Sequence, residues 1–512
     1  MSVQENGSVL QNGPASALNS EFGEKDIAAV LKPLRQRGVI SDIGERLRAL
    51  QALRKFIINF EGTFIKTLAS DLHRHRQETV ILETQVALSE CNEAIKHLHA
   101  WSSRRPVSTP CVALPGSAFV EPISKGTVLI IAPFNYPVQL SMVALVSAIA
   151  AGNTTVLKLS ELTPETSMAI ATHLNDYLAK DIVGVVLGGP KTGGLLLKEK
   201  FDHIFFTGSE RVGKIVMKAA AEYLTPVTLE LGGKSPCVVF PSTNIALAAK
   251  RIMWTKWANA GQTCIAGDYA LVHESVYDAF IEACQLAVKE FSNDNAIEGS
   301  PDFCRIINET HATRLQGLLN DCRDRILLGG DANISACFVA PTVVGPVVKS
   351  DALMQSEIFG PILPVMTFGS LSEAVEIIND ICPTPLALYV FGDTKEMEGV
   401  LSKVKSGSAC INDCVFQFTL SGAPFGGIGT SGMGAYHGQR GFDEFSHLRP
   451  VLIRSAKSLF DLPQRYPPYK QSSEDLIKTV LHWTNLNSSS LSAIFKFVVL
   501  TGILAAAVKA AI

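Results

Sequence analysis

Short runs of β-branched and aromatic residues alternate with helix signals between Gly126 and Gly213. The runs cover residues 128–132, 154–158, 183–187 and 203–206, and a stretch predicted to be helical follows each of them. Strands and helices that alternate at this spacing form right-handed βαβ units, which assemble into a parallel sheet. Ligands of such sheets bind beyond the carboxyl ends of the strands. The sequence therefore predicts an α/β fold with a binding site at that edge of the sheet.

A second alternation follows Pro236. Strand-like runs at 237–240 and 269–272 are interleaved with predicted helices at 245–258, 276–291 and 309–323, and another strand and helix flank residues 359–364. A chain of 512 residues is long enough for roughly two to four domains. We therefore expect two doubly wound, Rossmann-like α/β domains with a cleft between their sheets.

The segment before Gly126 has a different pattern. Apolar residues spaced by three and four from Ile43 to Phe60 mark one face of a long helix, with Ser41 or Asp42 as its N-cap. A second helix is predicted over 78–101. Prolines between 106 and 122 then exclude a helix, and residues 118–122 are typical of a short strand outside the main body. Residues 1–20 are expected to be a disordered lead-in rather than a signal or transit peptide.

Charge and cysteine usage narrow the classes of function. A net charge of −3 provides no basic surface for nucleic acid. The short basic run from His73 to Arg76 is predicted to be a solvated helix end. Eleven cysteines without framework spacing indicate reduced thiols in a cytosolic setting. Cys410 and Cys414 lack a second pair at zinc-like spacing, so no metal site is predicted.

One cysteine, Cys264, stands among small and polar residues rather than on an apolar face. Gly261 lets the backbone approach a ligand closely, and Gln262 and Thr263 offer hydrogen bonds. The backbone N–H of Cys264 is itself able to face a developing oxyanion. The setting favours a nucleophile over an inert structural thiol.

A nucleophilic cysteine needs a donor for the oxyanion and a base for a later water. Asn135 lies just past a predicted strand, between Pro133 and Pro137, where its amide is a candidate donor; the alternative is a turn-forming asparagine. Glu230 ends an apolar strand-like run, so partial burial is expected to raise its pKa toward that of a general base. The alternative for Glu230 is a salt-bridged structural carboxylate.

Several motifs suggest a nucleotide site. Gly208 and Ser209 follow a predicted strand and open a helix that contains Gly213, which is a favourable place for a phosphate or pyrophosphate. The literal G-x-G-x-x-G at Gly427 has no strand before it and no helix after it, so we interpret it as a false match.

Two further pairs are candidates for holding riboses. Lys158 and Glu161 follow a predicted strand and can hold the adenosine ribose, and the acidic residue favours a free 2′-hydroxyl over a phosphate. Glu357 and Phe359 can act similarly on a second ribose and its ring. Each of these interpretations is weak alone, but their order along the chain strengthens them together.

The motifs together resemble the aldehyde dehydrogenase family over about residues 24–470. The motifs that carry the resemblance are Phe-Asn-Tyr-Pro, Lys-Leu-Ser-Glu, Phe-Thr-Gly-Ser, Glu-Leu-Gly-Gly-Lys-Ser-Pro, Gly-Gln-Thr-Cys, Glu-Ile-Phe-Gly-Pro and Pro-Phe-Gly-Gly-Ile-Gly-Thr-Ser-Gly-Met-Gly. The sequence is most similar to the class 3 branch, which contains fatty aldehyde dehydrogenases with an apolar C-terminal tail.

The resemblance implies a mechanism. Cys264 attacks the aldehyde carbonyl, Asn135 and the backbone N–H of Cys264 stabilise the oxyanion, and the thiohemiacetal gives hydride to a nicotinamide. Glu230 then activates the water that hydrolyses the thioester. The implied cofactor is NAD, with NADP possible. The implied dinucleotide contacts are Lys158, Glu161, Gly208, Ser209, Gly213, Glu357 and Phe359.

The resemblance also implies a domain organisation. Residues 21–106 and 124–232 form the NAD-binding domain, and residues 233–440 form the catalytic domain. Residues 107–123 and 441–460 form a β-arm for homodimerisation. A linker with an amphipathic helix at 472–483 covers 461–490, and the tail covers 491–512.

The tail is apolar apart from Lys496, Lys509 and a few hydroxyl residues. As a helix, residues 491–512 would rise about 33 Å, which is enough to cross about 30 Å of hydrocarbon, whereas residues 497–508 alone would rise only about 18 Å. Lysines near both ends can snorkel. We therefore expect a membrane-anchored protein whose catalytic domain faces the cytosol, and the alternative is a buried or membrane-surface helix.

The expected activity is oxidation of a long-chain or otherwise hydrophobic aldehyde. An apocarotenal or isoprenoid aldehyde suits the same tail, and a coenzyme A-acylating or semialdehyde dehydrogenase is a rival within enzymes. A non-catalytic protein would have lost Cys264, Glu230 or Asn135, and all three are present. A plain cysteine hydrolase would need no nucleotide loop.

Overall fold

The strands predicted between residues 126 and 207 form a parallel sheet. The computed structural model describes residues 22–109, 113, 115–457, 461 and 465–486. The sheet has the order β17-β7-β6-β3-β4-β5, and all pairs among its last five strands are parallel. Its strands are β3 (Thr127–Ile131), β4 (Thr154–Lys158), β5 (Val183–Val186), β6 (His203–Thr207), β7 (Val227–Glu230) and β17 (Gly432–Met433).

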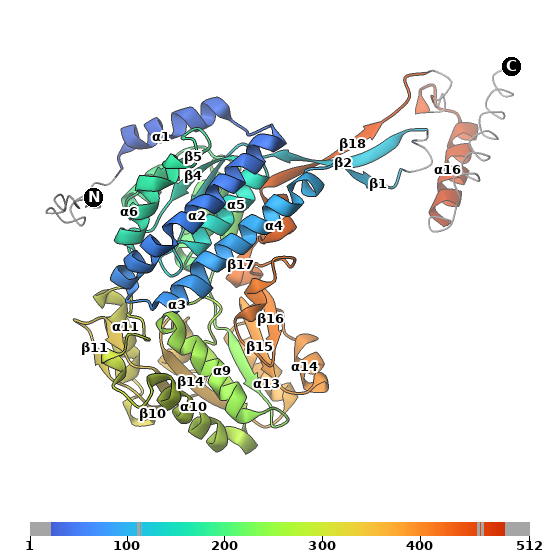
Figure 1. Cartoon of the computed structure of the whole chain (residues 1–512). Helices are drawn as coiled ribbons and strands as arrows, with labels where there is room; N and C mark the ends of the chain where they lie inside the picture. The colour runs from blue at the N-terminus through green and yellow to red at the C-terminus, as the bar shows by residue number, and fades with distance from the viewer. Residues whose placement is uncertain (1–21, 110–112, 114, 458–460, 462–464, 487–512) are drawn as a thin grey trace, which may run out of the picture. The chain divides into compact units, whose positions relative to one another are not determined.

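Helices cover both faces of this sheet, as a doubly wound fold requires. Alternate residues of each strand point to opposite faces, and the core is divided accordingly. Val128 and Ile130 of β3 belong to one apolar cluster, and Leu129 belongs to the other. The covering helices are α1 (Glu24–Arg37), α2 (Ile43–Leu72), α4 (Gln85–Trp101), α5 (Gln139–Ala150), α6 (Pro164–His173), α7 (Pro190–Leu196) and α8 (Glu210–Ala221). Figure 1 shows α2, α4 and α5 packed together on one side.

The long helix predicted from the apolar spacing is α2. Asp42 caps it by accepting hydrogen bonds from the N–H groups of Gly44 and Glu45, which confirms one of the two predicted N-caps. The helix ends at His73, which is left-handed, with φ of 51°. After it come α3 (Arg76–Thr79) and a π-helical turn, Val80–Thr84, which leads directly into α4.

The basic run at the end of α2 is not a solvated helix end, so that prediction is wrong for Arg74. The Arg74 side chain has no exposed surface and forms an ion pair with Glu83, which is equally buried. The basic run alone could not reveal this partner, because the carboxylate that compensates the Arg74 charge belongs to the next helical segment, Val80–Thr84.

The second alternation forms a second sheet, with the order β10-β13-β14-β9-β8-β15-β16. All its pairs are parallel except β10 with β13. Its strands are β8 (Pro236–Val239), β9 (Tyr269–His273), β10 (Ile326–Leu328), β13 (Thr342–Val344), β14 (Ile362–Phe368), β15 (Ala387–Phe391) and β16 (Ser408–Ile411). The helices of this region are α9 (Ile245–Trp257), α10 (Tyr277–Ser292), α11 (Glu309–Asn320), α12 (Ala352–Gln355), α13 (Leu371–Ile381) and α14 (Thr394–Leu401), and β11 (Ala332–Asn333) and β12 (Phe338–Val339) make a small ladder. The predicted α/β class with two largely parallel sheets is confirmed.

Contacts divide the chain into two compact units. Residues 1–101 and 124–447 belong to the first, which contains both large sheets and helix α15 (Gly438–Glu444). Residues 102–123 and 448–512 belong to the second. The strands β1 (Arg105–Val107), β2 (Ser117–Ser124) and β18 (Ser446–Ile453) form a three-stranded sheet in the order β1-β2-β18, and the strand predicted at 118–122 lies within β2.

The amphipathic helix predicted at 472–483 is α16 (Gln471–Leu486). Within the described ranges, no helix combines the length and apolar character needed to cross a bilayer. The predicted tail at 491–512 and the predicted lead-in at 1–20 lie outside the described residues.

Candidate active site

The loop before Cys264 has an unusual backbone. Helix α9 ends at Trp257, and the next residues include Asn259 and Ala260, both with φ of 50°, and Gly261, with φ of 69°. Left-handed conformations are disfavoured for residues with a Cβ atom, so Asn259 and Ala260 are held in this conformation by their surroundings. A Cβ atom at Gly261 would lie 2.3 Å from the carbonyl oxygen of Gly360. This turn carries Cys264 to the wall of a cavity.

The Cys264 thiol is half-buried and holds its proton tightly. Burial raises its pKa to about 12, and the neighbouring Glu357 and Glu230 carboxylates act in the same direction. The backbone N–H groups of Cys264 and Ile265 oppose this effect. The thiolate is the nucleophilic form, so the resting thiol needs a base or a change of surroundings before it reacts.

The loop after β3 brings Asn135 to the Cys264 loop. Asn135 is 3% exposed, and its Nδ2 donates to the carbonyl oxygen of Gln262 over 3.1 Å. The hydroxyls of Tyr136 and Thr263 lie 2.7 Å apart and join the same two loops. An amide nitrogen carries two hydrogens, so one N–H of Asn135 remains for a ligand.

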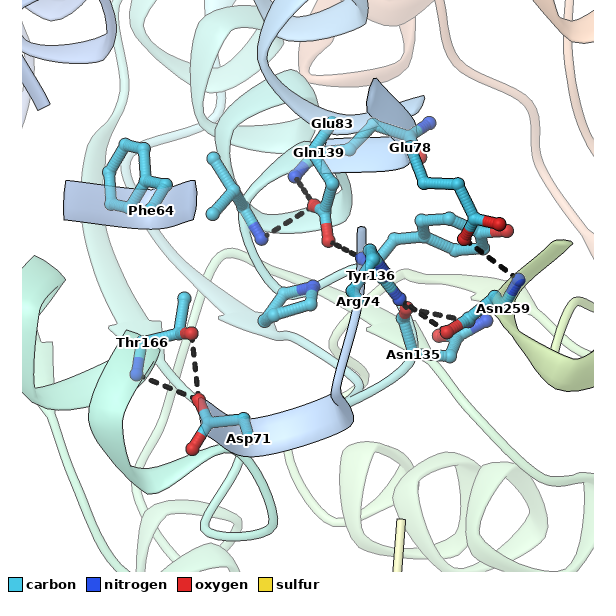
Figure 2. Close-up of polar contacts among 12 residues, drawn as sticks. Phe64, Asp71, Arg74, Glu78, Glu83, Asn135, Tyr136, Gln139, Thr166 and Asn259 are labelled. Atoms are coloured by element: carbon cyan, nitrogen blue, oxygen red, sulfur yellow. Dashed lines mark hydrogen bonds and ion pairs between the residues drawn. The ribbon is translucent and has the colours of Figure 1, made fainter. Parts of the chain in front are cut away.

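A buried polar network supports both loops (Figure 2). Arg74 donates to the carbonyl oxygen of Asn135 and to Oδ1 of Asn259, each over 2.5 Å. Its partner Glu83 accepts from the backbone N–H groups of Val138 and Gln139 over 3.0 and 2.7 Å. The sequence patterns assign no role in the site to Arg74, which they predict to be part of a solvated helix end, or to Asn259, although Asn259 lies in the same loop as Cys264.

Glu230 lies at the carboxyl end of β7 and is 3% exposed. Among the described residues neither of its carboxylate oxygens has a hydrogen-bond partner. Burial raises its pKa well above the ordinary value, and the negative charge of Glu444 adds to the effect. The expected desolvation of this carboxylate is confirmed. An unpartnered buried carboxylate is costly, which favours a proton-transfer role over a structural one.

The glycine-rich segment around Gly427 flanks Glu230. Strand β17 pairs antiparallel with β7, and Gly432 lies opposite Glu230. Gly432 has φ of 141°, and a Cβ atom there would lie 2.0 Å from the carbonyl oxygen of Leu229. Only glycine permits this approach. The G-x-G-x-x-G match is therefore a packing element beside the buried carboxylate, and the sequence did not reveal that pairing.

A pocket opens beside Cys264, with about 440 Å³ of empty space that includes its opening to solvent. Its walls are largely apolar and aromatic, and they come from several elements. The lining residues are Leu82, Tyr136, Gln139, Leu140, Thr263, Cys264, Ile265, Val415, Phe418, Phe425, Tyr436 and His437. His437 is 4% exposed, and burial lowers its pKa to about 4, so its ring is neutral. Except for Thr263 and Cys264, the sequence patterns did not assign these residues to a site.

The predicted phosphate and ribose residues lie at the carboxyl ends of β4 and β6, which β3 separates in the sheet. Lys158 is the last residue of β4, and it forms an ion pair of 2.9 Å with Glu161. Gly208 follows β6, where a Cβ atom would lie 2.6 Å from the Phe206 ring. Ser209 caps α8 by accepting from the N–H of Val212. Side-chain-free backbone beside a helix N-terminus fits an anionic phosphate group.

Gly213 lies one turn into α8. A Cβ atom at this position would lie 2.7 Å from the Leu231 side chain, so Gly213 permits close packing of the helix on the end of β7. The close packing keeps the N-terminus of α8 near the end of the strand that carries Glu230.

Glu357 and Phe359 come from the second sheet region and lie close to the Glu230 and Asn135 segments. A Cβ atom at Gly232 would lie 2.1 Å from Oε2 of Glu357. Burial raises the pKa of Glu357 to about 8, and the Asp268 charge adds to it. The ring of Phe359 lies 5.8 Å from that of Phe134, centroid to centroid. The structure thus brings together Cys264, Asn135, Glu230, Glu357 and Phe359.

Comparison with known proteins gives a consistent result. Residues 39–451 match the aldehyde dehydrogenase family. Aldehyde dehydrogenase family 3 member B1 of Rattus norvegicus is 44% identical over 427 residues, which cover 83% of this chain and 90% of the relative. The 4,4'-diaponeurosporen-aldehyde dehydrogenase of Staphylococcus aureus is 42% identical over 430 residues, 84% of this chain and 93% of the relative.

Solved structures agree with these relatives. The substrate-bound state of Staphylococcus aureus AldH has a TM-score of 0.85 and 39% identity, and the match covers 89% of this chain and 99% of that one. A Mycobacterium tuberculosis aldehyde dehydrogenase complexed with NAD+ has a TM-score of 0.77 and 26% identity, with 86% and 92% of the two chains covered.

Proposed function

The chain belongs to the aldehyde dehydrogenase family, and from that premise we propose that it oxidises a hydrophobic aldehyde to the carboxylic acid through Cys264. The observation that carries the proposal is the largely apolar cavity that ends at the Cys264 thiol. An apolar chain that leaves water for these walls contributes binding energy roughly in proportion to its length.

In the proposed reaction, the Cys264 thiol gives its proton to the neighbouring Glu230 carboxylate. The Sγ atom then bonds to the carbonyl carbon, and the carbonyl oxygen becomes negative. Glu230 passes this proton to solvent before the hydrolytic step. The free N–H of Asn135 and the backbone N–H of Cys264 stabilise that oxygen. The dinucleotide, when bound, supplies the acceptor for the hydride of the same carbon. Glu230 takes a proton from the water that then hydrolyses the thioester, for which its raised pKa makes it a stronger base than an exposed glutamate.

The residues at the strand ends fit a nicotinamide dinucleotide, NAD or NADP. We assign the adenosine ribose to Lys158 and Glu161, and the pyrophosphate to Gly208, Ser209 and the α8 N-terminus, which Gly213 holds close to the sheet. Glu357 and Phe359 would hold the second ribose and ring. The NAD+ complex of the Mycobacterium tuberculosis relative supports this class of cofactor.

The same proposal assigns residues 21–106 and 124–232 to dinucleotide binding and 233–440 to catalysis. Residues 107–123 and 441–460 would form the dimerising arm. We further propose that residues 491–512 anchor the protein to a membrane with the catalytic domain facing the cytosol. Deleting residues 484–512 should leave oxidation of short aldehydes intact and release the protein into the soluble fraction; an unchanged membrane fraction would exclude the anchor.

Two substrate classes fit the cavity, fatty aldehydes and apocarotenal-type aldehydes, and the diaponeurosporen-aldehyde relative supports the second. Steady-state rates with NAD and NADP across alkanals of increasing chain length, plus one apocarotenal, distinguish them. We expect kcat/KM to increase with chain length. A maximum at the shortest aldehydes would contradict a hydrophobic substrate.

The Cys264→Ala variant tests the chemistry. It should lose oxidation entirely, and Cys410→Ala, a half-buried cysteine of β16 outside the cavity lining, should retain it. Turnover that requires coenzyme A would instead indicate an acylating dehydrogenase, for which Glu230 as a hydrolytic base would be unnecessary.

A further inference from the structure

Arg74 joins three segments that meet behind the Cys264 loop. We propose that it is a positioning residue, which orients the Asn135 amide relative to the Cys264 loop so that both can stabilise the oxyanion. The proposal rests on the role proposed above for Asn135. Arg74 contacts Asn135 through that residue's backbone oxygen, so it positions the amide and does not itself touch the reacting atoms.

Asn135 is held by a closed set of hydrogen bonds. Its carbonyl oxygen accepts from Arg74 over 2.5 Å and from Nδ2 of Asn259 over 3.0 Å. Its own Nδ2 donates to the carbonyl oxygen of Gln262, which also accepts from Asn259 over 3.0 Å. Figure 2 shows Arg74 beside Asn135 and Asn259. The direction of the remaining Asn135 N–H is therefore fixed at both the main chain and the side chain.

Asn259 has a conformation that needs support from its neighbours. It is left-handed, with φ of 50° and ψ of 28°, two residues before Gly261. Arg74 holds its Oδ1, and Glu78 accepts from its backbone N–H over 3.0 Å. Asn259 is therefore held at its backbone and at its side chain, which compensates the cost of the left-handed turn.

The buried charge of Arg74 ties a further segment to the same loop. A buried cation needs a partner, and Glu83 provides it. Glu83 in turn accepts from the first N–H groups of α5, at Val138 and Gln139. Through Glu83, the ion pair thus also holds the end of the Asn135 loop that leads into α5. One guanidinium therefore sets the positions of residues 135–139 and 259–262.

The test is a double-mutant cycle on the full chain. Arg74→Lys keeps the charge beside Glu83 but loses the fork that reaches two acceptors. We expect kcat to fall about tenfold and the KM for the aldehyde to change less than twofold, because the lost interaction acts in the transition state. Asn135→Ala should lower kcat about 100-fold. The double variant should match Asn135→Ala within twofold, because Arg74 acts through Asn135.

Arg46→Lys is the matched control. Arg46 is partly buried, whereas Arg74 is fully buried, and it also donates to backbone oxygens, those of Ile40 and Ala150, away from the pocket that Cys264 lines. It should lower Tm and leave kcat unchanged. If Arg74→Lys does not fold, Asn259→Ala takes its place in the cycle, because it removes the Oδ1 atom through which Arg74 holds the Cys264 loop.

Two results would overturn the inference: wild-type kcat in Arg74→Lys, or losses that multiply in the double variant. Wild-type kcat in Asn135→Ala would instead remove the proposed oxyanion role, and with it the basis of the inference. The two failures are therefore distinguishable.

Discussion

Cys264 is buried near the Glu357 and Glu230 carboxylates, and these surroundings decide how its reactivity depends on pH. Its raised pKa keeps it a thiol at neutral pH, with Glu357 and Glu230 contributing after burial. Replacing Glu230 by glutamine removes one of these negative charges and should lower the pKa of Cys264. In the dinucleotide-free enzyme, the midpoint of Cys264 alkylation by iodoacetamide against pH should therefore move to lower pH in Glu230→Gln.

Glu282→Gln, which removes an exposed carboxylate of α10, is the control and should leave the alkylation midpoint unchanged. A wild-type midpoint at or below the ordinary thiol value of 9.0 would contradict the assignment.

Glu90 of α4 is a second buried carboxylate, and its effect is on stability. Burial raises its pKa from 4.5 to about 7, although it accepts a hydrogen bond from the N–H of Gly438 over 2.6 Å. The folded state then binds the proton more tightly than the unfolded state, so stability falls as pH rises from about 4.5 to about 7. The full cost is about 3 kcal/mol.

Glu90→Gln keeps an acceptor for Gly438 and does not titrate. Its Tm should equal that of the wild type below pH 4.5 and exceed it by several degrees at pH 8. Glu222→Gln, at an exposed glutamate, should show no such dependence. An equal Tm for Glu90→Gln and the wild type at pH 8 would contradict the buried-charge assignment.

At the scale of elements, the two-residue strand β17 pairs with the strand that carries Glu230, so its loss should affect both stability and activity. It lies along β7 with Gly432 opposite Glu230. Gly432→Ala places a Cβ atom against the Leu229 carbonyl and strains a backbone that favours glycine. We expect β17 to detach, Tm to fall by several degrees and kcat to fall with it, because Glu230 loses the backbone beside it.

Gly422→Ala changes the same segment where a Cβ atom meets nothing within 4 Å, and it should behave as the wild type. Unchanged Tm and kcat in Gly432→Ala would show that β17 does not support Glu230.

The contrast between β3 and β17 shows what the sequence could predict. Strand β3 and its neighbours have continuous β-branched runs, so their existence and parallel pairing followed from local pattern. Strand β17 has the sequence Gly-Met and a partner about 200 residues away, and no local propensity indicates it. The same holds for Arg74, whose burial depends on Glu83 and on Asn259, 185 residues later in the chain. Cys264, Asn135 and Glu230 were identifiable because their neighbours are unusual locally.

At the scale of the whole molecule, strand β18 has no strand partner on its outer edge among the described residues. It is the outer strand of the sheet β1-β2-β18, and Leu448, Leu452 and Ile453 on it are exposed by 39%, 51% and 51%. An exposed apolar edge strand is suited to pairing with another chain, which supports the proposed homodimer. Leu452→Lys should shift the mass measured by light scattering from two chains to one.

Leu224→Lys, at an apolar residue of the first unit that is 89% exposed, is the control and should leave that mass unchanged. A wild type that is monomeric at assay concentration would remove the basis for this pairing.

The long sequence separation between β7 and β17 also affects how the first sheet forms during synthesis on the ribosome. Strand β7 ends at Glu230, and its outer neighbour begins only at Gly432. At about 5–20 residues per second, roughly 10–40 s of translation separate the two. During that interval the edge that will hold the buried carboxylate is an unpaired strand, open to pairing with other nascent chains. The first sheet is thus completed only when nearly the whole chain has emerged.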